Sequence, residues 1–182
     1  MEWNVIVAGD ENDYTHRLTA VLEREGHHIC SRGSKADMLI FCIDPAPCEG
    51  DDYEKLAWNY EKSAMGLVQT VGKCIPLLKD GKGKRLCFLT TLRSSINGTR
   101  AADHWERVIA ASCNMAIRTF FNRYAREGYT FRVFGVEDFT EDSACDAAEY
   151  FLCGRSLEPE SDLHSDEKRL VLRDRFEREY PW

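Results

Sequence analysis

A glycine followed by a mostly acidic stretch stands where an α/β protein could bind a phosphate. Gly9 comes directly after the apolar run 5–8 and before a segment with helical periodicity. Such a strand-to-helix turn presents backbone N–H groups that bind phosphate. Asp10, Glu11 and Asp13 would place carboxylates beside that phosphate. The stretch leaves three interpretations open: a cofactor site, an acidic site of another kind, or the remains of a lost cofactor site.

Cysteine and histidine, the other residues that could do chemistry, do not form a recognisable pattern. The chain has 8 Cys and 5 His, with no C-x-x-C, H-x-x-x-H or H-E-x-x-H spacing. We therefore expect no metal site. Cys30, Cys42, Cys74 and Cys87 lie in apolar stretches, where a thiol behaves as a small apolar group. We expect reduced, mostly buried thiols.

Composition limits the classes of protein that need to be considered. The 182 residues, 43% of them hydrophobic, suit one domain, 1–182, with one sizeable core. The net charge of −7 argues against a nucleic-acid partner. No apolar run approaches the ~20 residues of a membrane span, so we expect no membrane partner. The first residues do not resemble a signal peptide, so we expect a cytoplasmic protein.

Strand and helix patterns alternate along the chain. Continuous apolar runs predict strands at 3–8, 27–30, 37–43, 85–90, 130–136 and 170–173, and apolar residues at three-to-four spacing predict helices at 12–25, 53–79, 104–127 and 142–153. This alternation predicts an α/β protein: a Rossmann-like three-layer α/β/α fold with a mainly parallel sheet.

The two long helices carry apolar stripes that should face the sheet or a partner. In 53–79 the stripe is Leu56, Tyr60, Ala64, Leu67, Val68, Val71, Ile75 and Leu78. In 104–127 it is Trp105, Val108, Ile109, Ser112, Ala116, Phe120 and Tyr124.

Parallel sheets bind ligands at the carboxyl ends of their strands, near the point where strand order reverses. The candidate site is therefore formed by 9–15, 44–47 and 90–95.

Over residues 3–174 the order of elements resembles the short-chain dehydrogenase/reductase family. The stretch SAMGLVQTVGKCIPLLKDGKGKRLCFLTT (63–91) resembles the long central helix and the strand that carries the family's catalytic Ser. The stretch AASCNMAIRTFFNRYAREGYTFRVFGV (110–136) resembles the next helix and strand. The chain is shorter than typical members, and the segment that usually covers the substrate is reduced to an acidic loop.

The resemblance implies a cofactor loop of the form G-x-x-x-G-x-G, whose register falls on Gly9, Asp13 and Thr15. Only the first Gly is present, and Asp13 would oppose a pyrophosphate, so we expect Asp13 to cap the helix instead. Arg32 and Asp44 fall at other positions where the resemblance implies cofactor contact, Arg32 with the 2′-phosphate of NADP. We interpret all five positions as vestigial and expect no cofactor.

The family's catalytic group is also incomplete. The resemblance places its Asn at Ser63, its Ser at Thr91, its Tyr at Ala110 and its Lys at Asn114. The Lys lowers the pKa of the Tyr so that the phenol can transfer a proton. No Y-x-x-x-K occurs in the chain, so we expect no catalytic residues of this kind.

Three functions remain open. The favoured one is a non-catalytic binding, regulatory or assembly subunit with a degraded cofactor loop; the resemblance implies a homo-oligomer through 53–79 and 104–127, and a protein partner is an additional expectation. The main alternative is an NAD- or NADP-dependent oxidoreductase with an atypical site that uses Thr91. The third is a receiver-like phospho-acceptor domain with Asp10 and Glu11 on Mg²⁺ and Asp44 as acceptor.

Overall fold

The predicted strands pair in one sheet, as seen in a computed structural model that describes residues 2–9, 13–31, 33–44, 52–97, 104–152, 166 and 169–182. The order is β2-β1-β3-β4-β5-β6-β7. Neighbours are parallel except the last pair, β6 and β7, which are antiparallel. The strand β7 was not predicted from the sequence. The strands are β1 (Asn4–Gly9), β2 (His28–Ile29), β3 (Met38–Cys42), β4 (Arg85–Thr91), β5 (Thr130–Val136), β6 (Leu172–Arg173) and β7 (Glu179–Tyr180).

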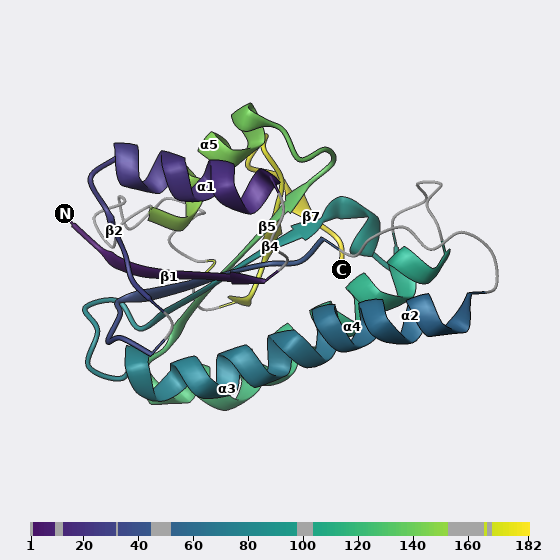
Figure 1. Cartoon of the computed structure of the whole chain (residues 1–182), viewed down its shortest axis with the longest axis horizontal. Helices are drawn as coiled ribbons and strands as arrows, with labels where there is room; N and C mark the ends of the chain where they lie inside the picture. The colour runs from purple at the N-terminus through teal and green to yellow at the C-terminus, as the bar shows by residue number, and fades with distance from the viewer. Residues whose placement is uncertain are drawn as a thin grey trace.

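Helices cover both faces of the sheet, which confirms the predicted three-layer fold (Figure 1). One face carries α1 (Asp13–Arg24) and α5 (Glu141–Leu152). The other carries α2 (Tyr53–Tyr60), α3 (Gly66–Leu78) and α4 (His104–Tyr124). Three short helical turns join these elements. The π-helical turn η1 (Glu61–Met65) lies between α2 and α3, and the 3₁₀ turns η2 (Leu92–Ser94) and η3 (Ala125–Glu127) follow β4 and α4.

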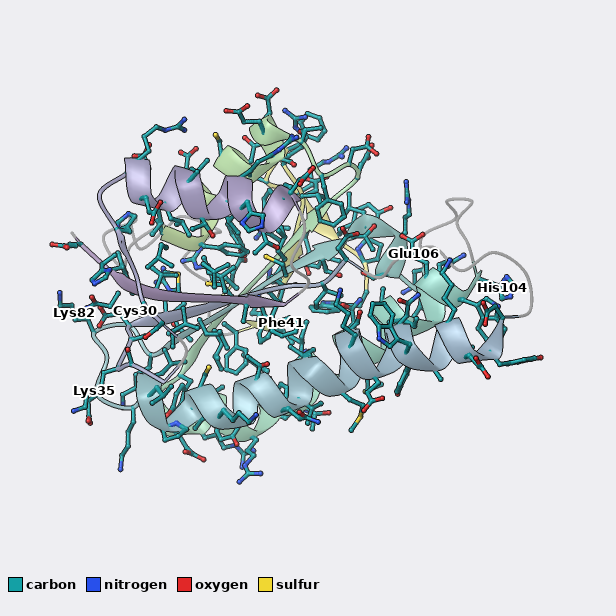
Figure 2. All side chains as sticks on the ribbon, viewed as in Figure 1. Cys30, Lys35, Phe41, Lys82, His104 and Glu106 are labelled. Carbon is teal, nitrogen blue, oxygen red and sulfur yellow. The ribbon has the colours of Figure 1, made fainter. Side chains whose placement is uncertain are left out.

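The core has two layers because the central strands are buried on both sides. In β3, Leu39 and Phe41 pack in the layer beneath α3 and α4 (Figure 2). Met38, Ile40 and Cys42 alternate with them and pack in the layer beneath α1 and α5. A parallel sheet covered on both faces requires such continuous apolar strands, which is why the sequence pattern identified them.

The helix predicted over 53–79 is interrupted by η1, and its buried face differs from the predicted stripe. Tyr60 and Val68 are each 40% exposed, whereas Asn59 and Ser63 are buried. A π-helical turn adds a residue to one turn and so rotates the preceding helix relative to the following one. The predicted stripe is therefore divided: Ala64, Leu67, Val71 and Leu78 pack in the core, whereas Tyr60 and Val68 face outward.

The stripe predicted on 104–127 faces the core in part, since Ile109 is buried and Ala116 and Phe120 pack against the core. Val108 is 50% exposed, whereas Glu106 and Asn114 are buried beside Ile109 and Cys113. Both buried polar side chains have partners, described below. A pattern of apolar residues cannot identify a face that includes paired polar groups.

The described residues also bear on cysteines, metals and membranes. Six cysteines there are free thiols, and Cys48 and Cys153 lie outside the described residues. Within the same part of the chain, no three His, Cys, Asp or Glu residues are grouped so as to hold a metal. None of the helices described is both long and apolar enough to cross a membrane.

Candidate functional site

The described residues of the predicted segments 9–15, 44–47 and 90–95 lie at the carboxyl edge of the sheet, whereas 10–12 and 45–47 lie outside the described residues. Gly9 pairs with Cys42 across β1 and β3, and Cys42 pairs with Leu89 of β4. The chain passes from β1 to β2 on one side and then returns to β3 on the other. This reversal of strand order beside β1 is the point where doubly wound sheets bind ligands.

Gly9 is required by its contact with β3, whether or not a phosphate binds. Its φ is 114°, a conformation that favours glycine, and an added Cβ would overlap the carbonyl oxygen of Cys42. Asp10 and Glu11 lie outside the described residues. The first Gly of the expected phosphate loop therefore has a purely structural explanation.

After Gly9 the described part of the chain resumes at Asp13. Asp13 is exposed in the first turn of α1; the residues directly before it lie outside the described residues, so its capping role stays a prediction. A carboxylate there interacts favourably with the helix dipole. Thr15 follows in the same turn and Asp44 is half-buried after β3, while Arg32 lies outside the described residues.

The four positions where the resemblance places the family's catalytic group lie on elements that pack together. Helix α4 contacts both η1, which holds Ser63, and η2, which Thr91 caps by accepting a hydrogen bond from the Arg93 N–H at 3.2 Å. Ala110 is fully buried on α4. The side chain of Asn114 donates to Ser94, at 3.0 Å to Oγ and 3.4 Å to the carbonyl oxygen.

Two side chains in this cluster had no predicted role: Ser94, which lies within the predicted site segment 90–95, and Glu106, which the sequence analysis did not single out. Glu106 is only 8% exposed on α4 (Figure 2), and its carboxylate lies 3.4 Å from Nη1 of Arg93. Glu106, Ala110 and Asn114 are spaced by four residues, so they share one helix face. The sequence therefore already placed the polar residues Glu106 and Asn114 on the same face of α4.

A phenol does lie near the carboxyl edge, but its environment is wrong for proton transfer. Tyr14, in the first turn of α1, is 3% exposed and packs edge-to-face on Phe139 at 4.8 Å between ring centroids. Burial raises the pKa of Tyr14 well above its usual value. The phenol therefore stays protonated, whereas a catalytic Tyr needs a lowered pKa.

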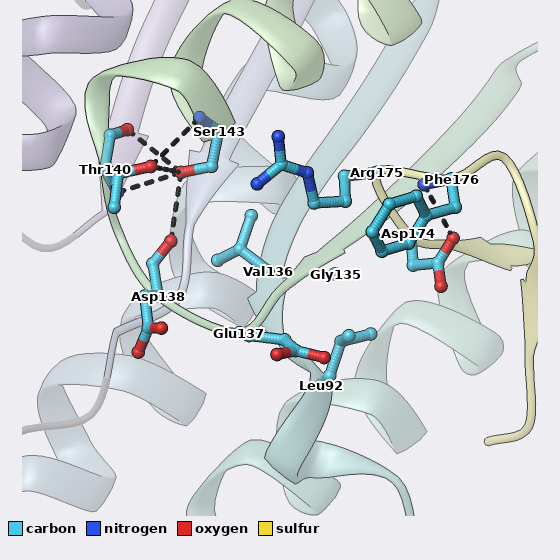
Figure 3. A pocket seen from close by; sticks show the side chains of 10 residues that line it. All are labelled: Leu92, Gly135, Val136, Glu137, Asp138, Thr140, Ser143, Asp174, Arg175 and Phe176. Atoms are coloured by element: carbon cyan, nitrogen blue, oxygen red, sulfur yellow. Dashed lines mark hydrogen bonds between the residues drawn. The ribbon is translucent and has the colours of Figure 1, made fainter.

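A pocket of about 180 Å³ opens at the same edge, beyond β4 and β5 (Figure 3). It lies between the end of β5, the start of α5 and the turn between β6 and β7, and sequence patterns had not identified it. Its lining residues are Leu92, Gly135, Val136, Glu137, Asp138, Thr140, Ser143, Asp174, Arg175 and Phe176.

Comparisons with known proteins return structural similarity without sequence similarity. No family model matches the chain, and no curated protein matches it by sequence. A protein from Burkholderia multivorans named as a short-chain alcohol dehydrogenase superposes with a TM-score of 0.75 at 12% identity, with 100% of both chains covered. An NADP complex of a carbonyl reductase from Pseudomonas aeruginosa gives 0.72 at 11% identity, covering 98% of this chain and 99% of the other.

The carbonyl reductase Sniffer of Drosophila melanogaster gives a TM-score of 0.69 at 11% identity over 98% of this chain and 99% of that one. The chain therefore has the fold of the short-chain dehydrogenases and reductases. At this level of identity the likeness shows the fold alone. The alignments span these chains almost completely, so the expected truncation is not confirmed.

Proposed function

We propose that the chain is a non-catalytic member of this fold class, which binds a partner or ligand as a regulatory or assembly subunit. The observation that carries the proposal is the state of α4, where the resemblance implies a Tyr and a Lys. Ala110 has no proton to transfer, and the amide of Asn114 donates to Ser94 rather than to a phenol. Without the ammonium–phenol pair, the proton transfer expected of the family has no donor there.

The residues at the start of α1 support the proposal. One carboxylate ~4 Å from a phosphate charge costs about 4 kcal/mol at an effective dielectric near 20. That is roughly three decades of affinity. Asp13 is exposed at the helix start, where the phosphate would lie.

The alternative is an NAD- or NADP-dependent oxidoreductase with an atypical site. The fold likeness includes reductases solved with NADP, and Thr91 offers a hydroxyl at the end of β4. Such an enzyme would need another proton donor and a loop that tolerates Asp13.

The receiver-like alternative is less well supported. β2 ends at Ile29 and β3 begins at Met38, and the described residues between them contain no helix. Acetyl phosphate with Mg²⁺ tests it directly, since a receiver would become phosphorylated at Asp44.

Titration with NADH and NADPH separates the two main candidates. Binding is measured by calorimetry and by tryptophan fluorescence, for which the 4 Trp of the chain give a signal. We expect no binding to the wild type at millimolar cofactor. Micromolar binding, followed by turnover in a carbonyl-substrate screen, would establish the oxidoreductase.

Asp13→Asn tests whether the Asp13 carboxylate is the reason for weak binding. Glu23→Gln is the matched change, at an exposed acid ten residues farther along α1 and away from its N-terminus. If the Asp13 carboxylate excludes the pyrophosphate, cofactor affinity rises in Asp13→Asn alone.

We also propose a homo-oligomer formed through the long helices. Their outer faces expose apolar side chains: Met65 (44%) and Val68 (40%) from η1 and α3, and Val108 (50%) and Met115 (66%) from α4. Exposed apolar side chains gathered on neighbouring elements favour protein contacts.

A further inference from the structure

Asn97 and Gly98 form the one Asn-Gly dipeptide in the sequence. Asparagine is a thermolabile residue, because the main-chain nitrogen of the next residue can attack the carbon of its side-chain amide. Glycine is the least hindered neighbour for this attack, since it has no Cβ. The dipeptide is therefore disposed to lose ammonia wherever the fold lets the Asn97 side chain approach that nitrogen.

The structure places Asn97 where this approach is possible. Asn97 is exposed and lies in a bend after η2, outside the described helices and strands. In helices and strands the main-chain N–H groups are held by hydrogen bonds, whereas loops have more conformational freedom. The asparagines of the described helices and strands are held in this way, and they are Asn4 in β1, Asn59 in α2, and Asn114 and Asn122 in α4.

The one Asp-Gly dipeptide of the sequence, Asp80-Gly81, shows how packing prevents the equivalent reaction. The Gly81 N–H donates to the Leu78 carbonyl oxygen at 3.0 Å, and a Cβ added to Gly81 would overlap the Ala36 carbonyl oxygen. Gly81 is therefore held on two sides, and its nitrogen cannot turn toward the Asp80 carboxyl group.

The side chain of Asn97 anchors Trp182. Its Nδ2 donates to the main-chain oxygen of Trp182 at 2.8 Å, at the end of the chain marked C in Figure 1. Trp182 and Tyr180 are partly buried against the core layer beneath α3 and α4. The hydrogen bond therefore joins the segment after β4 to the segment after β7.

We propose that Asn97 is a site of spontaneous deamidation and that the reaction releases Trp182. The Gly98 nitrogen forms a bond to Cγ of Asn97, and the bond from Cγ to Nδ2 breaks. Ammonia leaves with the proton of the Gly98 N–H, and a succinimide ring remains. Water then opens the ring to give aspartate or isoaspartate at position 97. The net reaction consumes one water and yields one ammonia, so it needs no oxidant or reductant.

The product reverses the polarity of the contact with Trp182. A side-chain amide has two N–H donors, whereas an ionised carboxylate only accepts hydrogen bonds. The new carboxylate and the main-chain oxygen of Trp182 therefore repel each other. The reaction also adds a negative charge two residues after Ser95, beside the predicted site segment 90–95.

Incubation of the full chain tests the reaction. The folded protein is kept at a mildly alkaline pH, and the tryptic peptide 94–100 (SSINGTR) is followed by mass spectrometry. We expect this peptide to convert to its aspartate and isoaspartate forms at a rate within tenfold of that in the guanidinium-unfolded chain. Peptides that contain Asn59 or Asn114 should keep their amides in the folded protein. A fold that protects Asn97 more than tenfold would overturn the proposal.

Two glycine variants identify the nitrogen that attacks. Gly98→Ala adds a Cβ beside that nitrogen and should slow the loss of ammonia at least tenfold. Gly72→Ala is the matched change in α3, where an added Cβ contacts nothing, and it should leave the rate unchanged. Equal rates in the two variants would overturn the mechanism.

The release of Trp182 is measured by acrylamide quenching of tryptophan fluorescence. The chain has 4 Trp, so the Trp182 signal is the difference from a Trp182→Phe background. We expect Asn97→Asp to raise the quenching of Trp182 at least twofold. Asn122→Asp, the same change at an exposed asparagine of α4, should not. Equal quenching in the two variants would overturn the release. None of these measurements uses a nucleotide cofactor, so their outcome is independent of the proposed function.

Discussion

Asp37 connects three segments at the amino-terminal edge of the sheet. Its carboxylate accepts hydrogen bonds from the Asn4 N–H at 2.9 Å, the Asn4 side chain at 3.1 Å and the Lys82 N–H at 2.8 Å. Burial by itself raises the pKa of Asp37, but these hydrogen bonds outweigh it and hold the pKa below its usual value. The folded protein therefore favours the charged form of Asp37.

This direction of shift predicts a pH-dependent stability. A carboxyl whose pKa is lowered by folding stabilises the protein above its unfolded pKa, about 3.9 for Asp, and loses that contribution as the pH falls through the folded pKa. We expect Asp37→Asn to lose about 1–3 kcal/mol of unfolding free energy at pH 7. It should also lose less stability than the wild type between pH 7 and pH 3, as measured by urea denaturation.

Asp80→Asn is the control for that measurement. Asp80 pairs with Lys35 at 3.5 Å, and both side chains are mostly exposed, so the pair contributes little. The unfolding free energy of Asp80→Asn should therefore change with pH as that of the wild type does. Identical pH dependence in Asp37→Asn and the wild type would contradict the role of Asp37.

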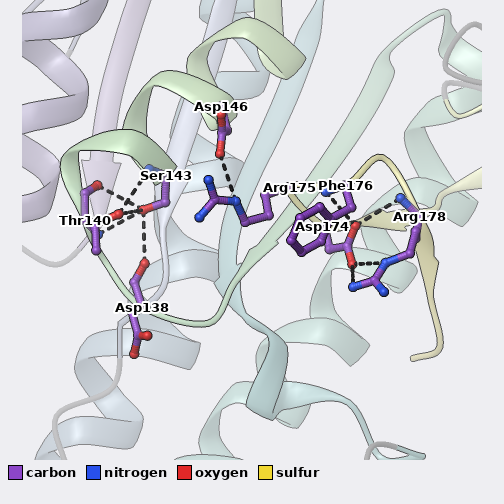
Figure 4. Close-up of polar contacts among 8 residues, drawn as sticks. All are labelled: Asp138, Thr140, Ser143, Asp146, Asp174, Arg175, Phe176 and Arg178. Carbon is purple, nitrogen blue, oxygen red and sulfur yellow. Dashed lines mark hydrogen bonds and ion pairs between the residues drawn. The ribbon is translucent and has the colours of Figure 1, made fainter.

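At the scale of the elements, the start of α5 is fixed by a local capping motif. Thr140 precedes the helix. Its hydroxyl accepts a hydrogen bond from the Ser143 N–H, and its own backbone N–H donates to Ser143 Oγ, which together form a capping box (Figure 4). Ser143 Oγ also donates to the Asp138 carbonyl oxygen at 3.0 Å. The box therefore fixes the segment between β5 and α5, which forms one side of the pocket.

Removing the cap should destabilise α5 without unfolding the sheet. We expect Thr140→Ala to cost about 1 kcal/mol of unfolding free energy, measured by thermal and urea denaturation. Thr119→Ala is matched to it: the Thr119 hydroxyl donates within α4 to the Met115 carbonyl oxygen at 2.9 Å, and its loss should change stability by less. A larger loss in Thr119→Ala would contradict the capping role.

At the scale of the whole molecule, the helical layer of α2, α3 and α4 exposes apolar side chains on the face that points away from the sheet. Met65, Val68, Val108 and Met115 are all at least 40% exposed. If this layer is the oligomer interface, a charge placed on it must be desolvated on assembly and should disrupt it.

We expect the wild type to be an oligomer in analytical ultracentrifugation and Met115→Lys to dissociate it at least tenfold more readily. Phe176→Lys is the comparison, because Phe176 is similarly exposed but lies on the turn between β6 and β7. A monomeric wild type, or equal effects of the two substitutions, would refute the interface.

The sequence by itself determined the fold class and most of the elements. Continuous apolar runs such as 37–43 and 85–90 fit only strands covered on both faces, and β3 and β4 lie within or close to these limits. The alternation of strands and helices then restricts the topology. The predicted parallel sheet also places Gly9, Asp44 and Thr91 at one edge, because the carboxyl ends of parallel strands lie at the same edge.

Tertiary structure alone decided which polar groups are buried and how they pair. The π turn at Glu61–Met65 rotates α2 and buries Ser63 instead of Tyr60, an outcome of packing against α4 that a helical stripe does not encode. Asp166 and Arg173 form a buried ion pair at 2.7 Å, and Asn114 meets Ser94 across 20 residues. Burial of such groups depends on partners distant in sequence. For the same reason the pocket, assembled from Leu92, the segment after β5 and the turn after β6, became visible only in the folded chain.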